Sequence, residues 1–273
     1  MTESSTKTRY WIITLTPDSE RTRALVSSLE DQGIHPRIFQ AVDGRRSMPE
    51  LEPGEEIARF RSRLRRLCDL TSAEVGCYLS HLRLIKQSLT AGDQAVCILE
   101  DDVRLEPDFA RIMSEVEQLP EHVEMVRLMG LKIRKRKIIQ ALGGGSHNLV
   151  RPERGWLGTQ AYFINKSGME KVVRYGSTIR EPIDKFYDHF WEHGLRIFGV
   201  EPHLVFEENQ NGSSIQKSDA QRASPPLPYR LMYPLAKGLF SLNRHLHLAL
   251  NRHEYYPATR PEKPMGRSER IRH

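Results

Sequence analysis

The feature that most constrains this chain is a five-residue apolar run, AVCIL at residues 95–99, followed at once by Glu100, Asp101 and Asp102. A short apolar and β-branched run is typical of a buried strand. Three carboxylates a few ångströms apart repel one another and raise each other's pKa unless a cation offsets them. In open α/β sheets, ligands bind outside the carboxyl ends of the strands. The pattern therefore predicts a polar site at the edge of a sheet.

A divalent cation would relieve this repulsion and would also hold a diphosphate. Carboxylate oxygens are hard ligands, which favours Mg²⁺ or Mn²⁺ over zinc. The alternative is an acidic turn in solvent that precedes the next helix, because carboxylates are stabilised near a helix N-terminus. The triplet by itself leaves both interpretations open.

The N-terminal segment predicts an α/β fold. Tyr10–Leu15 and Arg37–Val42 have the composition of strands, and Ser19–Gln32 between them has the apolar spacing of a helix. The second strand closes at the turn signal Asp43-Gly44. This β-α-β order predicts crossover connections and a sheet that helices cover.

The segment that begins at Thr71 predicts a long helix with a capping box, in which Thr71 and Glu74 bond each other's backbone amides. Glu74 and His81 are seven residues apart and share roughly one face. Gly76 inside a helix predicts close packing or the approach of a ligand. His81 is either a core histidine with satisfied hydrogen bonds or a residue of the cleft.

The rest of the chain predicts further alternating elements. We expect strands at residues 124–129, 157–164, 195–200 and 204–206, helices from residue 106, at 166–175 and at 182–193, and a mobile basic loop at 132–137 and 143–145.

The sequence gives no prediction of export. The N-terminus lacks a long apolar region before a cleavage site, and no run approaches the roughly 18 apolar residues of a membrane-spanning helix. The three cysteines, Cys68, Cys77 and Cys97, are odd in number and show no metal-ligand spacing. We therefore expect reduced thiols in a cytoplasmic protein.

The formal net charge of +6 is concentrated at the C-terminus. Residues 225–273 contain nine basic and three acidic residues, so residues 1–224 contain 32 of each. A basic protein raises nucleic acid as a partner, but here that argument applies only to the tail.

The tail predicts a basic amphipathic helix with a partly disordered end. Beyond the proline-rich segment at 225–228, one helical stripe carries Leu235, Leu239, Leu242, Leu246 and Leu250. Such a helix fits an anionic membrane surface, and it equally fits docking on the protein's own core. The basic tail and loop also leave a non-catalytic nucleic-acid-binding protein as an alternative function. A metal-dependent phosphoesterase is a third interpretation of the acidic triplet.

Several sequence blocks follow one another along residues 10 to about 215: YWIITLTPDSER from Tyr10, Ala41–Gly44, Leu70–His81, Ile98–Val103, Gly158–Tyr162, Pro182–Asp184 and residues 194–205. In this order they resemble glycosyltransferase family 25, the lipopolysaccharide- and lipooligosaccharide-biosynthesis galactosyltransferase-like family.

The resemblance implies a GT-A fold, a Rossmann-like α/β domain with a mostly parallel central sheet. This domain would occupy residues 1–224, and the basic amphipathic tail residues 225–273. It also implies an inverting, metal-dependent transfer of a sugar, commonly galactose, from a UDP-sugar to a lipid-linked lipopolysaccharide or lipooligosaccharide acceptor. Lipid-borne acceptors favour the membrane as the partner of the tail. We therefore expect a cytoplasmic protein at the inner membrane, and no nucleic acid.

The resemblance further implies roles for individual residues. Asp102, with Glu100, would bind Mn²⁺ or Mg²⁺. The residues near the nucleotide-sugar would be Thr14, Leu15, Arg21, Asp43, Gly44, His81, Glu100 and Asp101.

Inversion at the anomeric carbon needs a base near the acceptor hydroxyl. Asp184 and Asp188 are at i and i+4 of one predicted helix, so they share a face. They are the candidate catalytic residues, and Asp184 also belongs to a block of the resemblance. An equally good explanation of Asp184 is structural: the N-terminus of a helix stabilises a carboxylate there without any catalytic role.

Overall fold

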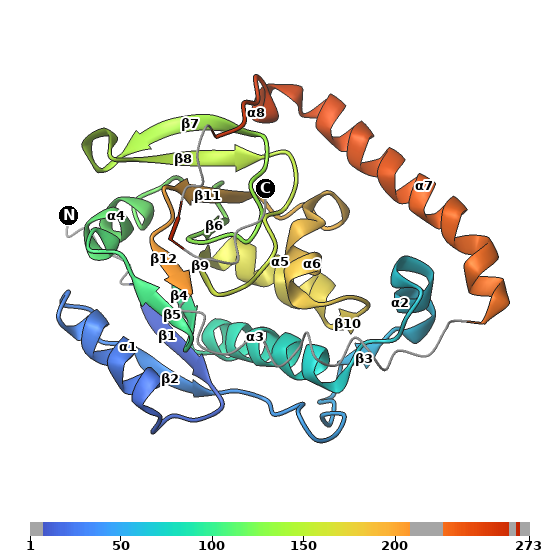
Figure 1. Cartoon of the computed structure of the whole chain (residues 1–273), viewed down its shortest axis with the longest axis horizontal. Coiled ribbons are helices and arrows are strands. Elements are labelled where there is room, and N and C mark those ends of the chain that lie inside the picture. The colour runs from blue at the N-terminus through green and yellow to red at the C-terminus, as the bar shows by residue number, and fades with distance from the viewer. Residues whose placement is uncertain (1–7, 208–225, 262–265, 268–273) are drawn as a thin grey trace.

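The computed structural model describes residues 8–207, 226–261, 266 and 267 (Figure 1). Its centre is an eight-stranded sheet with the order β2 (Arg37–Gln40), β1 (Arg9–Thr14), β4 (Ala95–Glu100), β9 (Ala161–Asn165), β6 (Met125–Arg127), β11 (Ile197–Glu201), β8 (His147–Pro152) and β7 (Arg136–Leu142). β8 and β9 run against the other six strands. The α/β sheet predicted from the sequence is confirmed.

Helices cover both faces of the sheet. One face carries α3 (Ser72–Thr90), α5 (Lys166–Gly176) and α6 (Ile183–Asp188), and the other carries α1 (Glu20–Glu30) and α4 (Phe109–Val116). Alternation along β4 explains the two cores. Val96 and Ile98 pack in the core of α3 and α5, and Cys97 and Leu99 pack in the core of α1 and α4.

Two short sheets flank the centre. β3 (Glu56–Ile57) pairs with β10 (Thr178–Ile179), and β5 (Val103–Leu105) pairs with β12 (Val205–Glu207). The second pair places Glu207 opposite Val103, directly after the acidic triplet. A carboxylate from far along the chain thus joins the edge that the triplet defines.

The capping box of α3 is confirmed. Thr71 Oγ1 accepts a hydrogen bond from the Glu74 amide at 3.2 Å, and the Glu74 carboxylate accepts one from the Thr71 amide at 2.8 Å. Arg66, at the end of α2 (Arg59–Arg66), pairs with the same carboxylate at 2.7 Å. The start of α3 is therefore fixed by local contacts and by its neighbour.

Three predicted elements differ from the structure. The basic run at 132–137 is not wholly a loop, because Arg136 begins β7, where it is buried and pairs with Glu201 at 2.7 Å. Residues 157–160 lie outside β9, because Leu157 and Gly158 adopt positive φ values of 60° and 76°. The helix predicted at 182–193 ends at Asp188 and is followed by the 3₁₀ turn η2 (Phe190–Glu192). A second 3₁₀ turn, η1 (Gly143–Gly145), joins β7 to β8.

The tail forms α7 (Leu227–Leu250) and α8 (Arg252–Tyr255). In Figure 1, α7 runs along the outside of the molecule from α8 to α2. The ring of Phe240 lies 4.6 Å from that of His189 and 5.2 Å from that of Trp191, and Tyr229 packs on Phe60 of α2. One face of α7 is therefore docked on the α/β domain.

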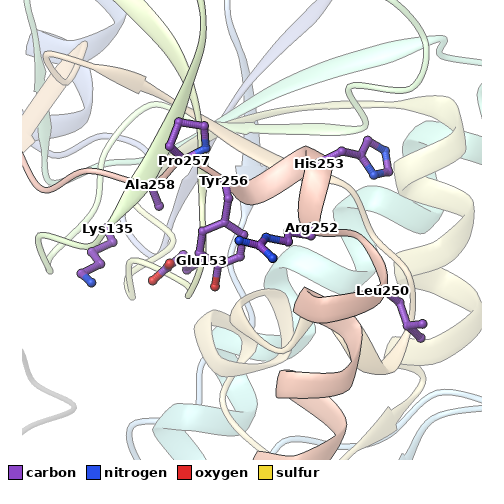
Figure 2. Close-up of a pocket in the computed structure, with 8 residues that line it drawn as sticks. All are labelled: Lys135, Glu153, Leu250, Arg252, His253, Tyr256, Pro257 and Ala258. Atoms are coloured by element: carbon purple, nitrogen blue, oxygen red, sulfur yellow. The ribbon is translucent and has the colours of Figure 1, made fainter.

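The segment after α7 is fastened to the β7–β8 hairpin. The backbones of Arg136 and Thr259 exchange hydrogen bonds at 3.0 Å, and Lys137 Nζ donates to the His253 carbonyl at 2.6 Å. Figure 2 shows the pocket between these elements, with Lys135 and Glu153 beside the hairpin and Tyr256 from the tail. The basic run thus contributes contacts within the protein.

The predicted domain boundary at residues 224 and 225 lies outside the described residues, as does most of the end for which disorder is predicted. Among the helices that the structure describes, none is both long and apolar enough to cross a membrane.

Two glycines allow α3 to approach the turn after β2. A Cβ atom at Gly76 would lie 2.7 Å from the Val42 carbonyl oxygen and 2.8 Å from the Gly44 amide nitrogen. A Cβ atom at Gly44 would lie 2.0 Å from the Ser72 carbonyl oxygen. Real Cβ atoms do not approach backbone so closely, so this contact requires glycine on both sides.

We expect Gly76→Ala to destabilise the fold by about 1–3 kcal/mol, because the added methyl overpacks against rigid backbone. Gly238→Ala is the matched control, since Gly238 also lies inside a helix but a Cβ there meets nothing within 4 Å. The control should gain up to about 1 kcal/mol from helix propensity. Urea unfolding of both variants measures the difference. Equal effects of the two substitutions would contradict this account of Gly76.

Candidate functional site

The first carboxylate of the site is held by two side chains from the start of the chain. Asp101 accepts a hydrogen bond from Thr14 Oγ1 at 2.5 Å and pairs with Arg21 Nη2 at 2.7 Å. Thr14 ends β1, and Arg21 lies in the first turn of α1. The structure therefore brings together three residues that the resemblance assigned to the nucleotide-sugar site, and their contacts hold the ends of β1 and β4 in register.

Glu100, the last residue of β4, faces the side of the sheet that α3 covers. It accepts a hydrogen bond from Thr159 Oγ1 at 2.5 Å, and its carboxylate lies 3.4 Å from His81 Nε2. His81 Nδ1 lies 2.9 Å from the Tyr162 hydroxyl, which lies 3.0 Å from the hydroxyl of Tyr187. His81 is thus both a buried histidine with a core partner and a neighbour of the acidic edge.

Asp102 has the most unfavourable environment of the three acids. Its Oδ1 is buried and has no hydrogen-bond partner among the residues that the structure describes. Burial, followed by the charges of Glu100 and Glu207, raises the pKa of this carboxyl to about 7. A positive charge at this point would lower that pKa and would satisfy the oxygen.

The other predicted residues lie at the same edge, because β1, β2 and β4 are parallel and end there. The Leu15 carbonyl accepts a hydrogen bond from Gln40. Asp43 pairs with Arg45 at 2.7 Å, and hydrogen bonds from Arg45 lower the pKa of the Asp43 carboxyl. Gly44 lies against the start of α3.

A strained turn connects this edge to α6. Leu157 has a φ of 60° and is not glycine, which is an unfavourable backbone conformation. Its amide donates to Asp188 Oδ2 at 3.0 Å, and its carbonyl accepts from Arg127 Nη2 at 3.0 Å. The next amide, of Gly158, donates to Asp184 Oδ2 at 3.4 Å. The two predicted catalytic carboxylates therefore meet at the turn that carries Thr159.

The two carboxylates differ in environment. Asp188 is buried, and burial raises its pKa to about 6 despite Arg127, whose Nη1 is 3.8 Å away. Such a buried carboxylate, hydrogen-bonded to the Leu157 amide, suits a structural role in which Asp188 holds the strained turn. Asp184 lies in the first turn of α6, where it also accepts from the Lys185 amide at 2.7 Å. Burial, followed by the charges of Glu100 and Asp184, raises the pKa of the Cys77 thiol.

Three further residues at this edge, Cys77, Thr159 and Arg127, have no site role predicted from the sequence. Cys77 Sγ, His81 and a Glu100 oxygen lie within 4.8 Å of one another, close enough to share a metal ion. The available signal was the i, i+4 spacing of Cys77 and His81, which places both on one face of α3. The sequence carried no signal of a role for Arg127, because its partners Leu157 and Asp188 come from distant segments.

A family model described as glycosyltransferase family 25 (LPS biosynthesis protein) matches residues 7–187. The chain belongs to this family, as the sequence blocks had predicted.

Relatives from animals include both galactosyltransferases and proteins described as inactive. A probable inactive glycosyltransferase 25 family member 3 from Bos taurus is 29% identical over 243 residues, covering 79% of this chain and 39% of the relative. Procollagen galactosyltransferase 1 from Danio rerio is 25% identical over 241 residues, covering 78% and 38%. The chain therefore spans about two fifths of the length of these relatives.

Among solved structures, a glycosyltransferase involved in glycosylation of the major capsid of PBCV-1 is 11% identical, with a TM-score of 0.40. The match covers 78% of this chain and 97% of that one. A second match, A197 from STIV, is 14% identical with a TM-score of 0.38 and covers 71% and 83%.

Proposed function

We propose that the protein is an inverting, metal-dependent glycosyltransferase that moves a hexose, galactose, from a UDP-sugar to a lipid-linked lipopolysaccharide or lipooligosaccharide acceptor. Membership of the family supports the transferase class. The observation that carries the proposal is the environment of Asp102 at the carboxyl end of β4.

The residues present fit a divalent cation. Asp102 offers a buried oxygen with no hydrogen bond inside the described part of the chain, and Glu100 and Glu207 add negative charge around it. Asp102 and Glu100 would hold Mn²⁺ or Mg²⁺, which prefer such oxygen ligands. The bound cation would stabilise the negative charge that develops on the departing diphosphate.

The chain's own residues would divide the remaining work. Arg21 neutralises Asp101, which leaves Asp102 as the acid that needs a cation. Asp184, in the first turn of α6 and hydrogen-bonded by the Gly158 amide beside Thr159, would take the proton from the acceptor hydroxyl as it attacks. Asp188 would hold the strained turn through the Leu157 amide.

One assay tests this proposal: transfer and donor hydrolysis across a panel of UDP-sugars, with and without Mn²⁺. We expect turnover with UDP-galactose that stops when Mn²⁺ is removed by a chelator. Asp102→Asn should lower turnover by about 10²–10³-fold, because it removes a ligand of the charge-stabilising cation. Asp184→Asn should lower transfer by about 10²–10⁴-fold while UDP still binds.

Asp108→Asn is the matched control, because Asp108 is an exposed carboxylate that pairs with Arg111. Its turnover should equal that of the wild type. Turnover that is absent for every UDP-sugar, or that persists in Asp102→Asn, would contradict the proposed function. Full transfer by Asp184→Asn would remove only the assignment of the base.

We also propose that α7 attaches the protein to an anionic membrane surface at the cytoplasmic face of the inner membrane. Seven leucines on the side of α7 that faces away from the domain form a leucine stripe, and each is more than half exposed: Leu227, Leu231, Leu235, Leu239, Leu242, Leu246 and Leu250. The 24 residues of α7 make this stripe about 36 Å long. Soluble monomers rarely expose a contiguous apolar surface of such size.

The position of the charges supports a lipid surface as the partner. Arg230 and Lys237 are exposed on a flank of α7, between the leucine stripe and the docked side of Tyr229 and Phe240. An interfacial helix binds through its buried apolar area and through the attraction of such cations to anionic lipids.

The triple variant Leu235→Gln, Leu239→Gln and Leu242→Gln should weaken binding to phosphatidylglycerol-containing vesicles by at least about 100-fold, because three apolar side chains no longer insert. Its thermal stability should not change, since these side chains are exposed. Lys237→Gln should weaken binding only about 5-fold, and only to anionic vesicles. Vesicle co-sedimentation measures both. Undiminished vesicle binding by the triple variant would exclude the leucine stripe as the membrane surface. The stripe would also be excluded if the wild type were a dimer and the triple variant a monomer, because the leucines would then form a dimer interface.

A further inference from the structure

A second cluster of potential metal ligands lies behind the acidic edge. Cys77 and His81 are one turn apart on α3, and Glu100 reaches them from the end of β4. One ligand atom of each lies within 4.8 Å of the other two. Among the His, Cys, Asp and Glu side chains that the structure describes, these three come close enough to one another to share an ion.

The distance between His81 and Glu100 is unusual for a hydrogen bond. At 3.4 Å, the separation of Nε2 and the carboxylate oxygen exceeds the ordinary range for such a charged contact. In a tetrahedral zinc site, bonds of about 2.1 Å to nitrogen and to oxygen separate those two atoms by about 3.4 Å. The spacing therefore matches two ligands of one ion better than a direct bond.

Neighbouring groups hold two of the three ligands in place. The Tyr162 hydroxyl lies 2.9 Å from His81 Nδ1, so that ring nitrogen has a partner and Nε2 is directed toward Glu100. Thr159 donates to the Glu100 carboxylate at 2.5 Å. Metal-binding histidines and carboxylates commonly have such outer contacts, which fix the ring and the carboxylate before the ion arrives.

We propose that Cys77, His81 and Glu100 form a binding site for a borderline divalent cation of the Zn²⁺ class, distinct from the oxygen-ligand site for Mn²⁺ or Mg²⁺. A thiolate and an imidazole select such ions over Mg²⁺ and Mn²⁺. The thiol releases its proton to solvent when it becomes a ligand. Three protein ligands leave one tetrahedral position open for water or for a substrate atom.

The site has a regulatory consequence that rests on the proposed function. Glu100 belongs to both ligand sets, so an ion held by Cys77 and His81 withdraws this carboxylate from the cation at Asp102. Micromolar Zn²⁺ should therefore inhibit the Mn²⁺-dependent transfer, and Cys77→Ser should resist that inhibition, measured as the ratio of its own turnover with and without Zn²⁺.

Cobalt spectroscopy tests the site without any assay of activity. Titration of the full chain with Co²⁺ should produce a thiolate-to-cobalt charge-transfer absorption in the near ultraviolet that saturates at one equivalent. Zn²⁺ should abolish this absorption by displacement, and excess Mg²⁺ should not. Tyr162→Phe should keep the absorption but weaken Co²⁺ binding by about 10–100-fold, because the ring of His81 loses its outer partner.

Cys77→Ser and Cys77→Ala should both lose the absorption, with thermal unfolding in the absence of metal confirming that at least one of them is folded. Cys68→Ser is the matched control, since Cys68 is likewise partly exposed, and it should behave as the wild type. An absent absorption in the wild type, or an unchanged one in the folded Cys77 variant, would overturn the proposal. Either result would leave the Mn²⁺-dependent reaction untouched, so the two proposals fail separately.

Discussion

The repulsion among carboxylates at the end of β4 is the constraint on which the rest of the structure depends. Asp101 is neutralised by Arg21 and hydrogen-bonded by Thr14. Glu100 is bonded by Thr159, which belongs to the strained turn before β9. Asp102 keeps a buried oxygen without a partner in the described part of the chain, and its pKa is raised to about 7. The fold therefore concentrates the unresolved charge on one acid, which is the property that a cation site needs.

The surrounding elements serve to hold this edge rigid. α3 contacts the turn after β2 without intervening side chains at Gly44 and Gly76. α6 holds the turn at Leu157 through Asp188, which is buried and hydrogen-bonded to its amide. Because α7 packs on the ring of His189, directly after α6, the tail is connected to the same helix. The acidic edge and the docked tail thus share one scaffold.

Local signals made much of this predictable from the sequence. The apolar run before Glu100 identified the edge, and the capping box of Thr71 and Glu74 fixed the start of α3, because both depend on residues close in sequence. The β7 strand was missed because most of its side chains are exposed, so no apolar alternation marks it. The contacts of Arg127 and Asp188 join segments far apart in the chain, and no pattern within either segment encodes them. The roles of the individual site residues in binding and catalysis stay predictions.

We propose that the acidic edge holds a divalent cation at Asp102 and Glu100 together with a nucleotide diphosphate. Anomalous diffraction from crystals grown with UDP and Mn²⁺ measures this directly. We expect one manganese peak within about 2.5 Å of an Asp102 carboxylate oxygen and in contact with the diphosphate. A peak at Cys77 and His81 alone, or nucleotide bound with no manganese at this edge, would contradict it.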